Sequence, residues 1–401
     1  MTAIRTRRFW VIGAFAAGWL VAAALLWRAE LPPGDIPSLD AEDAFSRAYL
    51  DRSERYQRFH RVNWALATLV ELVVLVLCVR LAPRARVSGV GGGVLLAAGT
   101  LIAVWVASVP FLVAGHWWRR RYDVSDAGYA RILVDPWLER IGGLAVAVAA
   151  IALLMLLARR LGDRWWLVGG PAFAAVGAAF LVAQPFLLSP RVEPLRDEAL
   201  AADIRALARE QGVGEVEVQV RDASRRTRAV NAEFYGVGPT KRIVIWDTAL
   251  EQLSRDELRV LVAHEFAHVD ADHVWKGIAW LFLFAVPGAW VVARVTRLRG
   301  GLGRPAAVPL ALLTLTVLQL VLQPATNAIS RRYEREADWL GLQAEPQPVA
   351  FEGLTRQLTR AALAQPDPPA WARVVFGTHP TPLERIELAR TLRAEEPRGG
   401  S

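Results

Sequence analysis

The sequence predicts a mainly α-helical, polytopic membrane protein with about seven transmembrane helices and one small α+β module. Apolar residues make up 54% of its 401 residues, and the mean hydropathy is +0.26. Several apolar runs reach about 18 residues, close to the roughly 20 that a helix needs to cross the hydrocarbon core. A long polar block holds an alternating stretch at 216–220 and an apolar-rich one at 243–246, which both indicate strands.

Seven apolar runs are expected to span the membrane. Trp residues mark many of their ends, as is typical of a membrane–water interface. The sixth run is the shortest and could instead be tilted or re-entrant. The runs lie at 9–27, 64–81, 90–113, 141–158, 165–188, 277–293 and 305–323.

These runs divide the chain into four expected parts. Residues 1–190 form a membrane region with about five spans, and residues 191–276 form a soluble part with a small sheet. Residues 277–323 add two further spans, and residues 324–401 form a helical C-terminal part.

The charge pattern argues for a membrane protein and against a nucleic-acid partner. The formal charge is +8, but the arginines cluster beside the apolar runs, where basic residues anchor spans and set topology. The single cysteine, Cys78, falls inside a span, which excludes a disulfide framework. The preference for Arg over Lys and the many alanines suggest a bacterial plasma membrane protein. Long and short connections both carry arginines, so the side that holds the soluble parts is left open.

A helix with a metal-binding motif is predicted after residue 254. Ser254 and Glu257 form a capping box, with a hydroxyl at the N-cap and a carboxylate three residues later. The helix continues into His264-Glu265-Phe266-Ala267-His268. Residues four apart share a helix face, so both imidazoles can bind one ion while Glu265 reaches a water beside it. This H-E-x-x-H arrangement predicts a zincin-like catalytic module with one Zn²⁺ per chain.

A zinc protease needs a third protein ligand, and acidic residues follow the seventh apolar run. Glu334 and Asp338 are four residues apart and share a helix face, whereas Glu336 points elsewhere. A solvated charged helix at the membrane surface would show the same spacing. The spacing alone therefore leaves the third ligand open.

Four segments together resemble one family. They are His264-Glu265-x-x-His268, Ser330-Arg331-x-x-Glu334-x-x-Ala337-Asp338, Asp222 to Arg226 leading to Asn231 to Gly236, and Lys241 to Leu250. This set resembles the CAAX prenyl protease 1 and HtpX-like family of integral-membrane zinc metalloproteases. The resemblance covers about residues 190–390, and the seven-run layout is more similar to the prenyl-protease branch.

The resemblance implies roles for individual residues around the zinc. Glu334 would be the third ligand. Asp338 would orient a ligand histidine, as carboxylates commonly do, and Asn327 is grouped with it. Asn231, Ala232 and Glu233 would lie on an edge strand that pairs with an extended peptide substrate. Without the resemblance, an ordinary strand and turn explains that stretch equally well.

A second capping box precedes the last helix. Thr381 and Glu384 form it, and Pro382 takes the first helical position. This local structure does not explain His379. The resemblance implies that His379 and Arg385 lie near the zinc, where they would stabilise a tetrahedral oxyanion.

The predicted function is hydrolysis of peptide bonds in peptides or membrane proteins by a zinc metalloendopeptidase. Glu265 would act as the general base. The alternatives are a seven-helix receptor or transporter with a structural metal, and an inactive protease homologue. Among the remaining polar residues, His273 is expected to face solvent after the zinc helix.

Overall fold

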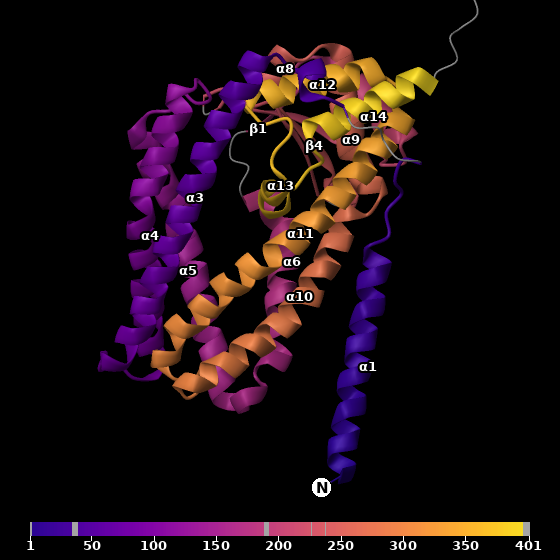
Figure 1. Cartoon of the computed structure of the whole chain (residues 1–401). Helices are drawn as coiled ribbons and strands as arrows, with labels where there is room; N and C mark the ends of the chain where they lie inside the picture. Colours follow the sequence, from indigo (N-terminus) through magenta and orange to yellow (C-terminus); the bar gives the residue numbers. More distant parts are fainter. Residues whose placement is uncertain (1, 34–38, 188–191, 226, 237, 396–401) are drawn as a thin grey trace, which may run out of the picture.

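A computed structural model of the protein describes residues 2–33, 39–187, 192–225, 227–236 and 238–395. Long helices form the lower part of the molecule, and short helices with a small sheet form a module above them (Figure 1). The long helices are α1 (Thr2–Leu26), α3 (Arg47–Leu81), α4 (Gly89–Arg121), α5 (Tyr129–Leu161), α6 (Trp166–Leu187), α10 (His273–Thr296) and α11 (Val308–Ala344).

Five of these helices are long and apolar enough to cross a membrane, judged by length and composition. They cover Arg47–Arg84, Gly89–Arg121, Gly143–Arg164, His273–Arg299 and Pro305–Ala344. The other two predicted runs fall on α1 and α6, whose apolar stretches Gly13–Leu26 and Trp166–Leu181 are shorter. The count of seven spans therefore stays a prediction. The sixth run, thought to be short, lies in α10, a single 24-residue helix that contains Pro287.

The outward faces of the long helices need an apolar environment. Leu69, Leu95 and Val146 expose 57%, 66% and 65% of their surface, although a soluble protein would cover such contiguous apolar patches. A lipid bilayer would cover them instead, as the composition predicts.

The module contains a four-stranded mixed sheet with the order β1-β2-β4-β3. Its strands are β1 (Val192–Pro194), β2 (Glu217–Arg221), β3 (Ala232–Tyr235) and β4 (Arg242–Trp246). β2 and β4 run parallel, while β1 and β3 pair antiparallel with β2 and β4, respectively. The two strands predicted from the sequence are β2 and β4. β3 lies at one edge of the sheet.

Helices enclose the core of the module. They are α7 (Glu198–Glu210), α8 (Asp247–Gln252), α9 (Arg255–Asp270), α12 (Pro348–Ala361) and α14 (Pro382–Glu395). The first three pack on the sheet, α12 packs on α9, and α14 packs on α12. The core includes Ile204 of α7, Ile245 of β4, Phe266 of α9 and Phe351 of α12, none exposed by more than 1%. Each such side chain contributes about 1.5–3 kcal/mol by leaving water, so α9 is fixed firmly against the sheet.

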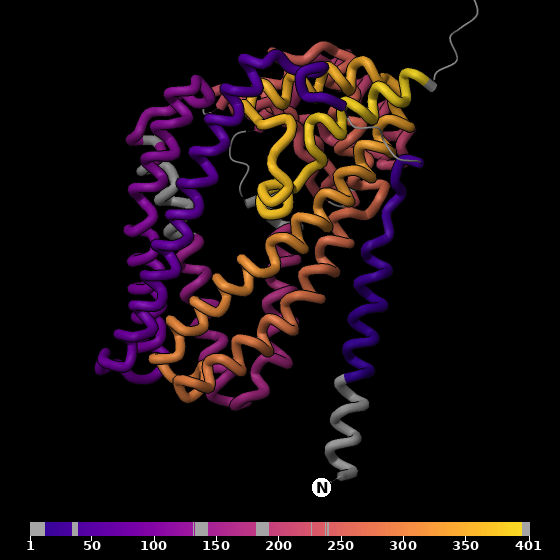
Figure 2. Tube along the Cα trace, in the orientation of Figure 1, coloured from indigo at the N-terminus to yellow at the C-terminus, as the bar shows by residue number. Residues whose placement is uncertain are grey.

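Two long helices return the chain to α9. α10 begins at His273, after Asp272 adopts a left-handed conformation (φ 56°), and leads away from the module. α11 comes back and packs beside α9 and α10, as the orange ribbons in Figure 1 and the trace in Figure 2 show. Segments that are distant in sequence therefore meet at α9. Two small helices, α2 (Ala41–Ala44) and α13 (Ala370–Phe376), complete the main elements.

Candidate metal centre

α9 is held in place at its start and along its length. Ser254 and Glu257 form the predicted capping box: Ser254 N donates to Glu257 Oε2 (2.8 Å), and Glu257 N donates to Ser254 Oγ (3.3 Å). One turn later, Arg259 donates to Glu345 Oε2 at 2.6 Å and also pairs with Asp203. These bonds connect α9 to α7 and to the end of α11.

A glycine lets α11 approach α9 closely. A Cβ atom at Gly341 would lie 3.1 Å from both the N and the Cα of His264, which is tighter than a side chain normally allows. Glu334 and Asp338 lie on the preceding turns of α11 and face the same part of α9. Gly341 therefore determines how near the carboxylates come to the histidines.

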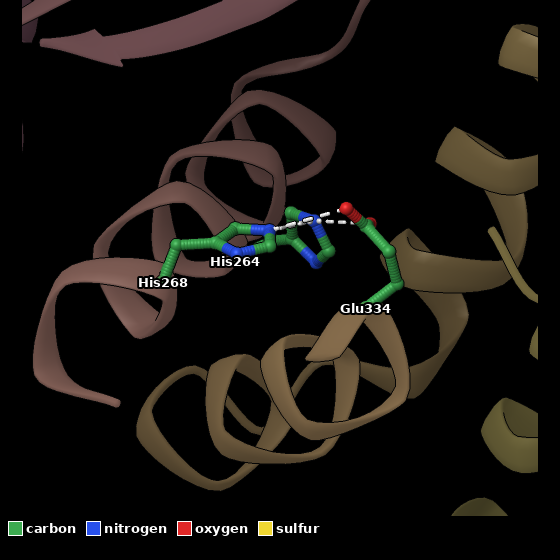
Figure 3. Close-up of side chains that lie close together, drawn as sticks. All are labelled: His264, His268 and Glu334. Atoms are coloured by element: carbon green, nitrogen blue, oxygen red, sulfur yellow. Dashed lines mark hydrogen bonds and ion pairs between the residues drawn. The ribbon is translucent and has the colours of Figure 1, made fainter. Parts of the chain in front are cut away.

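Three side chains converge at this crossing. His264 Nε2 lies 3.2 Å from His268 Nε2 and 3.4 Å from Glu334 Oε2, while His268 Nε2 lies 3.7 Å from Glu334 Oε1. One ligand atom from each residue can be chosen within 4.8 Å of the others. Figure 3 shows the two imidazoles of α9 pointing toward the Glu334 carboxylate on α11. The arrangement can hold one metal ion.

The far side of His264 contacts a buried carboxylate. His264 Nδ1 lies 2.9 Å from Asp338 Oδ1, and Arg385 Nη2 donates to the same oxygen at 2.5 Å. Asp338 is only 2% exposed. The Arg385 guanidinium also lies over the Phe351 ring, 5.1 Å from its centroid. Arg385 thus supports Asp338, which in turn contacts His264.

His273, which the sequence predicts to face solvent, instead contacts the ligand His268. His273 is 7% exposed, and its Nδ1 lies 2.8 Å from His268 Nδ1. Its Nε2 lies 2.9 Å from Glu336 Oε2, and Glu336 is also buried. The expectation for His273 was wrong because the left-handed turn at Asp272 directs the first residue of α10 back toward α9.

The end of α1 is fastened to the same turn of α11. Glu336 Oε1 accepts a hydrogen bond from Glu30 N at 2.6 Å, and the Tyr333 hydroxyl donates to Leu26 O at 2.6 Å. The Tyr333 ring stacks on His273, with centroids 4.5 Å apart. The first helix is therefore connected to the residues on both sides of Glu334.

His379 reaches the ligand cluster from the segment before α14. Its Nε2 lies 3.3 Å from Glu334 Oε2, yet 59% of its side chain remains exposed. Asn327 donates to Val375 O at 2.6 Å, and Arg331 donates to Gly377 O at 2.5 Å. Asn327, expected beside a metal ligand, thus holds the end of α13 and the backbone that leads to His379.

The edge strand β3 presents its backbone outward beside α9. Trp246 N donates to Asn231 O (3.0 Å), so in this antiparallel pair the NH and CO groups of Ala232 and Phe234 point away from β4. Phe234 packs edge-on against Phe266 of α9. The Glu233 carboxylate pairs with Arg221 at 2.6 Å, so its side chain is already engaged.

Charges around the cluster favour a cation. Burial alone would lower the pKa of His264, but Asp338 and Glu334 outweigh it and raise that pKa to about 10. Burial and the neighbouring His264 lower the pKa of His268 to about 3, which keeps its ring neutral. Burial raises the pKa of Glu265 to about 7. The cluster thus favours the binding of a cation, and the Glu265 carboxylate is suited to proton transfer near neutral pH.

Comparisons with known proteins identify relatives of the chain. Residues 194–393 match peptidase family M48. The chain is 32% identical over 281 residues to an uncharacterized metalloprotease, YhfN, of Bacillus subtilis, covering 67% of this chain and 66% of that protein. It is 28% identical over 192 residues to the CAAX prenyl protease 1 homolog of Dictyostelium discoideum, covering 44% of this chain and 45% of the relative. The chain therefore spans just under two thirds of the first relative and about half of the second.

The fold has a counterpart among solved structures. The crystal structure of S. mikatae Ste24p matches with a TM-score of 0.72 and 20% identity, covering 93% of this chain and 96% of that one. At this identity the likeness concerns the fold alone.

The fold and the ligand cluster together define a multi-pass membrane protein with a His-His-Glu cluster that can hold a metal ion. Within that class the chain belongs to peptidase family M48, as the sequence resemblance predicted. The comparisons do not favour a receptor or transporter with a structural metal.

Proposed function

We propose that the chain is a zinc endopeptidase that cleaves peptides or segments of membrane proteins. The observation that carries this proposal is the convergence of His264, His268 and Glu334 beside Glu265 and the edge strand β3. Three protein ligands suffice for a catalytic zinc ion. These ligands and Glu265 lie on α9 and α11.

The ligand atoms fit a tetrahedral zinc ion. Bonds of about 2.0–2.1 Å in tetrahedral geometry separate ligand atoms by about 3.3 Å. The separations of 3.2 Å between the two Nε2 atoms and 3.4 Å between His264 and Glu334 agree with this value, while His268 Nε2 lies farther from Glu334, at 3.7 Å from Oε1. Two imidazoles and one carboxylate also form a typical catalytic zinc set that leaves one position open.

The chain's own residues supply the remaining chemistry. When bound, zinc would polarise the scissile carbonyl and lower the pKa of water. Glu265 would take the proton from the attacking water and return it to the leaving amine. His379, which is partly exposed next to Glu334, would donate a hydrogen bond to the oxyanion. Asp338 and His273 would hold the ligand rings in orientation.

The substrate would bind as an added strand. The NH and CO groups of Ala232 and Phe234 point away from β4, which suits pairing with an extended peptide of varied sequence. Ala232 is 2% exposed and the Phe234 NH donates to Glu265, so the peptide would replace the contacts that these groups now make. In an extended segment, the peptide bond to be cleaved is also accessible to the catalytic groups. We place the enzyme in a bacterial plasma membrane, in line with the multi-pass arrangement and the arginine-rich composition.

The decisive variant is Glu265→Gln. The full chain, purified in detergent, should retain one zinc by elemental analysis but lose cleavage of casein or a model peptide. Glu251→Gln, at an exposed position of α8, is the matched control and should retain both properties. Normal cleavage by Glu265→Gln would contradict the mechanism. Stoichiometric zinc without turnover in the unmodified protein would favour an inactive homologue.

A further inference from the structure

A second site lies at the end of the helix bundle that is remote from the metal centre. A cavity of about 590 Å³ opens where the α3–α4, α5–α6 and α10–α11 connections meet, at the bottom of Figure 1. Its volume is within the range of small-molecule sites, about 300–1,000 Å³. The lining includes Ser88, Arg159, Asp163, Trp165 and Arg304.

The three connections are strongly basic. Residues 80–88, 159–165 and 294–304 together contain ten arginines and one acidic residue, Asp163. Asp163 pairs with Arg297 at 3.0 Å. Within the described part of the chain, neither Arg159 nor Arg304 has a carboxylate at ion-pair distance. Two guanidinium groups that line the cavity are therefore available for an anion.

Glycines let these two arginines pack into the cavity wall. A Cβ atom at Gly303 would lie 2.9 Å from Arg159 Cγ, and one at Gly300 would lie 2.7 Å from Arg304 Cδ. Gly300 also has φ +80°, which a side chain would disfavour. The Arg159 Nη1 atom extends toward Gly89 at the start of α4. Arg159 thus reaches from α5 between the other two connections.

The cavity lies at the ends of the apolar helices. All five candidate spans begin or end at its rim, at Arg84, Gly89, Arg164, Arg299 and Pro305. In a bilayer, such span ends lie at the depth of the lipid headgroups. A lipid from the membrane could place its charged headgroup in the cavity while its acyl chains lie along the helices.

We propose that this cavity binds the phosphate headgroup of an anionic phospholipid. Guanidinium groups match phosphate oxygens with paired hydrogen bonds. Basic pockets between transmembrane helices commonly hold anionic headgroups. The bound lipid connects three pairs of helices at the end remote from the metal cluster, so it stabilises the bundle without contacting a residue of that cluster.

The test uses the full chain in detergent with phosphatidylglycerol, phosphatidylcholine or inorganic phosphate. Native mass spectrometry measures bound lipid, and thermal denaturation measures Tm. We expect phosphatidylglycerol to bind and raise the Tm, and phosphatidylcholine and inorganic phosphate to do neither. The double variant Arg159→Gln/Arg304→Gln should bind phosphatidylglycerol roughly 30-fold more weakly, since each basic residue near an anionic headgroup contributes about fivefold.

A matched double variant controls for diffuse attraction. Arg80→Gln/Arg160→Gln removes the same charge from exposed positions at the same end, outside the cavity lining. It should weaken binding far less. An equal loss in both double variants would overturn a defined site, and equal binding of phosphatidylcholine would overturn selection by charge. An equal Tm increase with inorganic phosphate would overturn the lipid as the ligand.

Discussion

His264 Nδ1 lies 2.9 Å from Asp338 Oδ1, deep between α9 and α11. The carboxylate can hold the ring in the orientation that directs Nε2 toward His268 and Glu334. Such supporting carboxylates typically change metal affinity by 10–100-fold when replaced. The contact therefore predicts that the two helices bind metal well only when Asp338 is ionised.

Asp338→Asn should weaken zinc binding by about 10–100-fold, measured by competition with a chelator. The amide keeps the shape of the side chain but removes the charge that favours a cation next to His264. Asp367→Asn, at an exposed position, is the control. Unchanged affinity in Asp338→Asn would show that the 2.9 Å contact is not important for binding.

Arg385→Gln separates two roles for this arginine. Because Arg385 contacts Asp338 at 2.5 Å, we expect a loss of zinc affinity, with near-normal kcat once zinc is saturating. An arginine that stabilised the oxyanion would instead leave zinc affinity unchanged and lower kcat. Zinc titration followed by steady-state kinetics at saturating metal distinguishes the two.

His273→Ala should lower zinc affinity, because the His273 ring contacts His268 through Nδ1 and Glu336 through Nε2. It thereby orients the His268 ring. Loss of a residue that orients a ligand typically costs 10–100-fold. Glu336→Gln should act in the same direction, and the double variant should cost less than the sum, since both act through one chain of contacts. Additive losses would indicate two independent effects.

Local patterns in the sequence predict the features of this molecule that depend on residues close together in the chain. The capping box at Ser254, the shared face of His264 and His268, and the strand at β4 all follow from spacing within one element. His273 and Glu336 could not be paired in this way, because they lie on separate helices whose crossing depends on tertiary packing. The contact between Arg385 and Asp338 could not be predicted for the same reason. The family resemblance predicts that Arg385 lies near the metal. Only the fold shows that Asp338 lies between Arg385 and the ligand His264.

The edge strand provides a matched pair of proline variants. Ala232→Pro removes an outward NH and should raise KM for peptides while leaving the β3–β4 ladder intact. Glu233→Pro removes an NH that faces β4 and should instead lower the Tm. If Ala232→Pro leaves KM unchanged, peptide pairing at β3 is wrong.

Asp247 gives the module a pH dependence of stability that is separate from the metal. Burial alone would raise the pKa of Asp247, but the Ser224 hydroxyl and the backbone NH groups of Ala223, Ser224 and Thr248 outweigh it and lower that pKa. A group with a lowered folded-state pKa stabilises the protein above its unfolded pKa, about 3.9, and loses that contribution as pH falls through the folded value.

Asp247→Asn should therefore lower the free energy of unfolding at pH 7 by about 1.5–3 kcal/mol, the order expected for hydrogen bonds to a charged group. The difference from the unmodified chain should shrink as the pH falls below about 4, because protonation removes the same charge from Asp247. Thermal denaturation in detergent between pH 3 and pH 7, with Asp367→Asn as control, measures this convergence. A difference that stays constant over that range would mean that the charge of Asp247 contributes nothing, and that the loss comes from the shape of the amide.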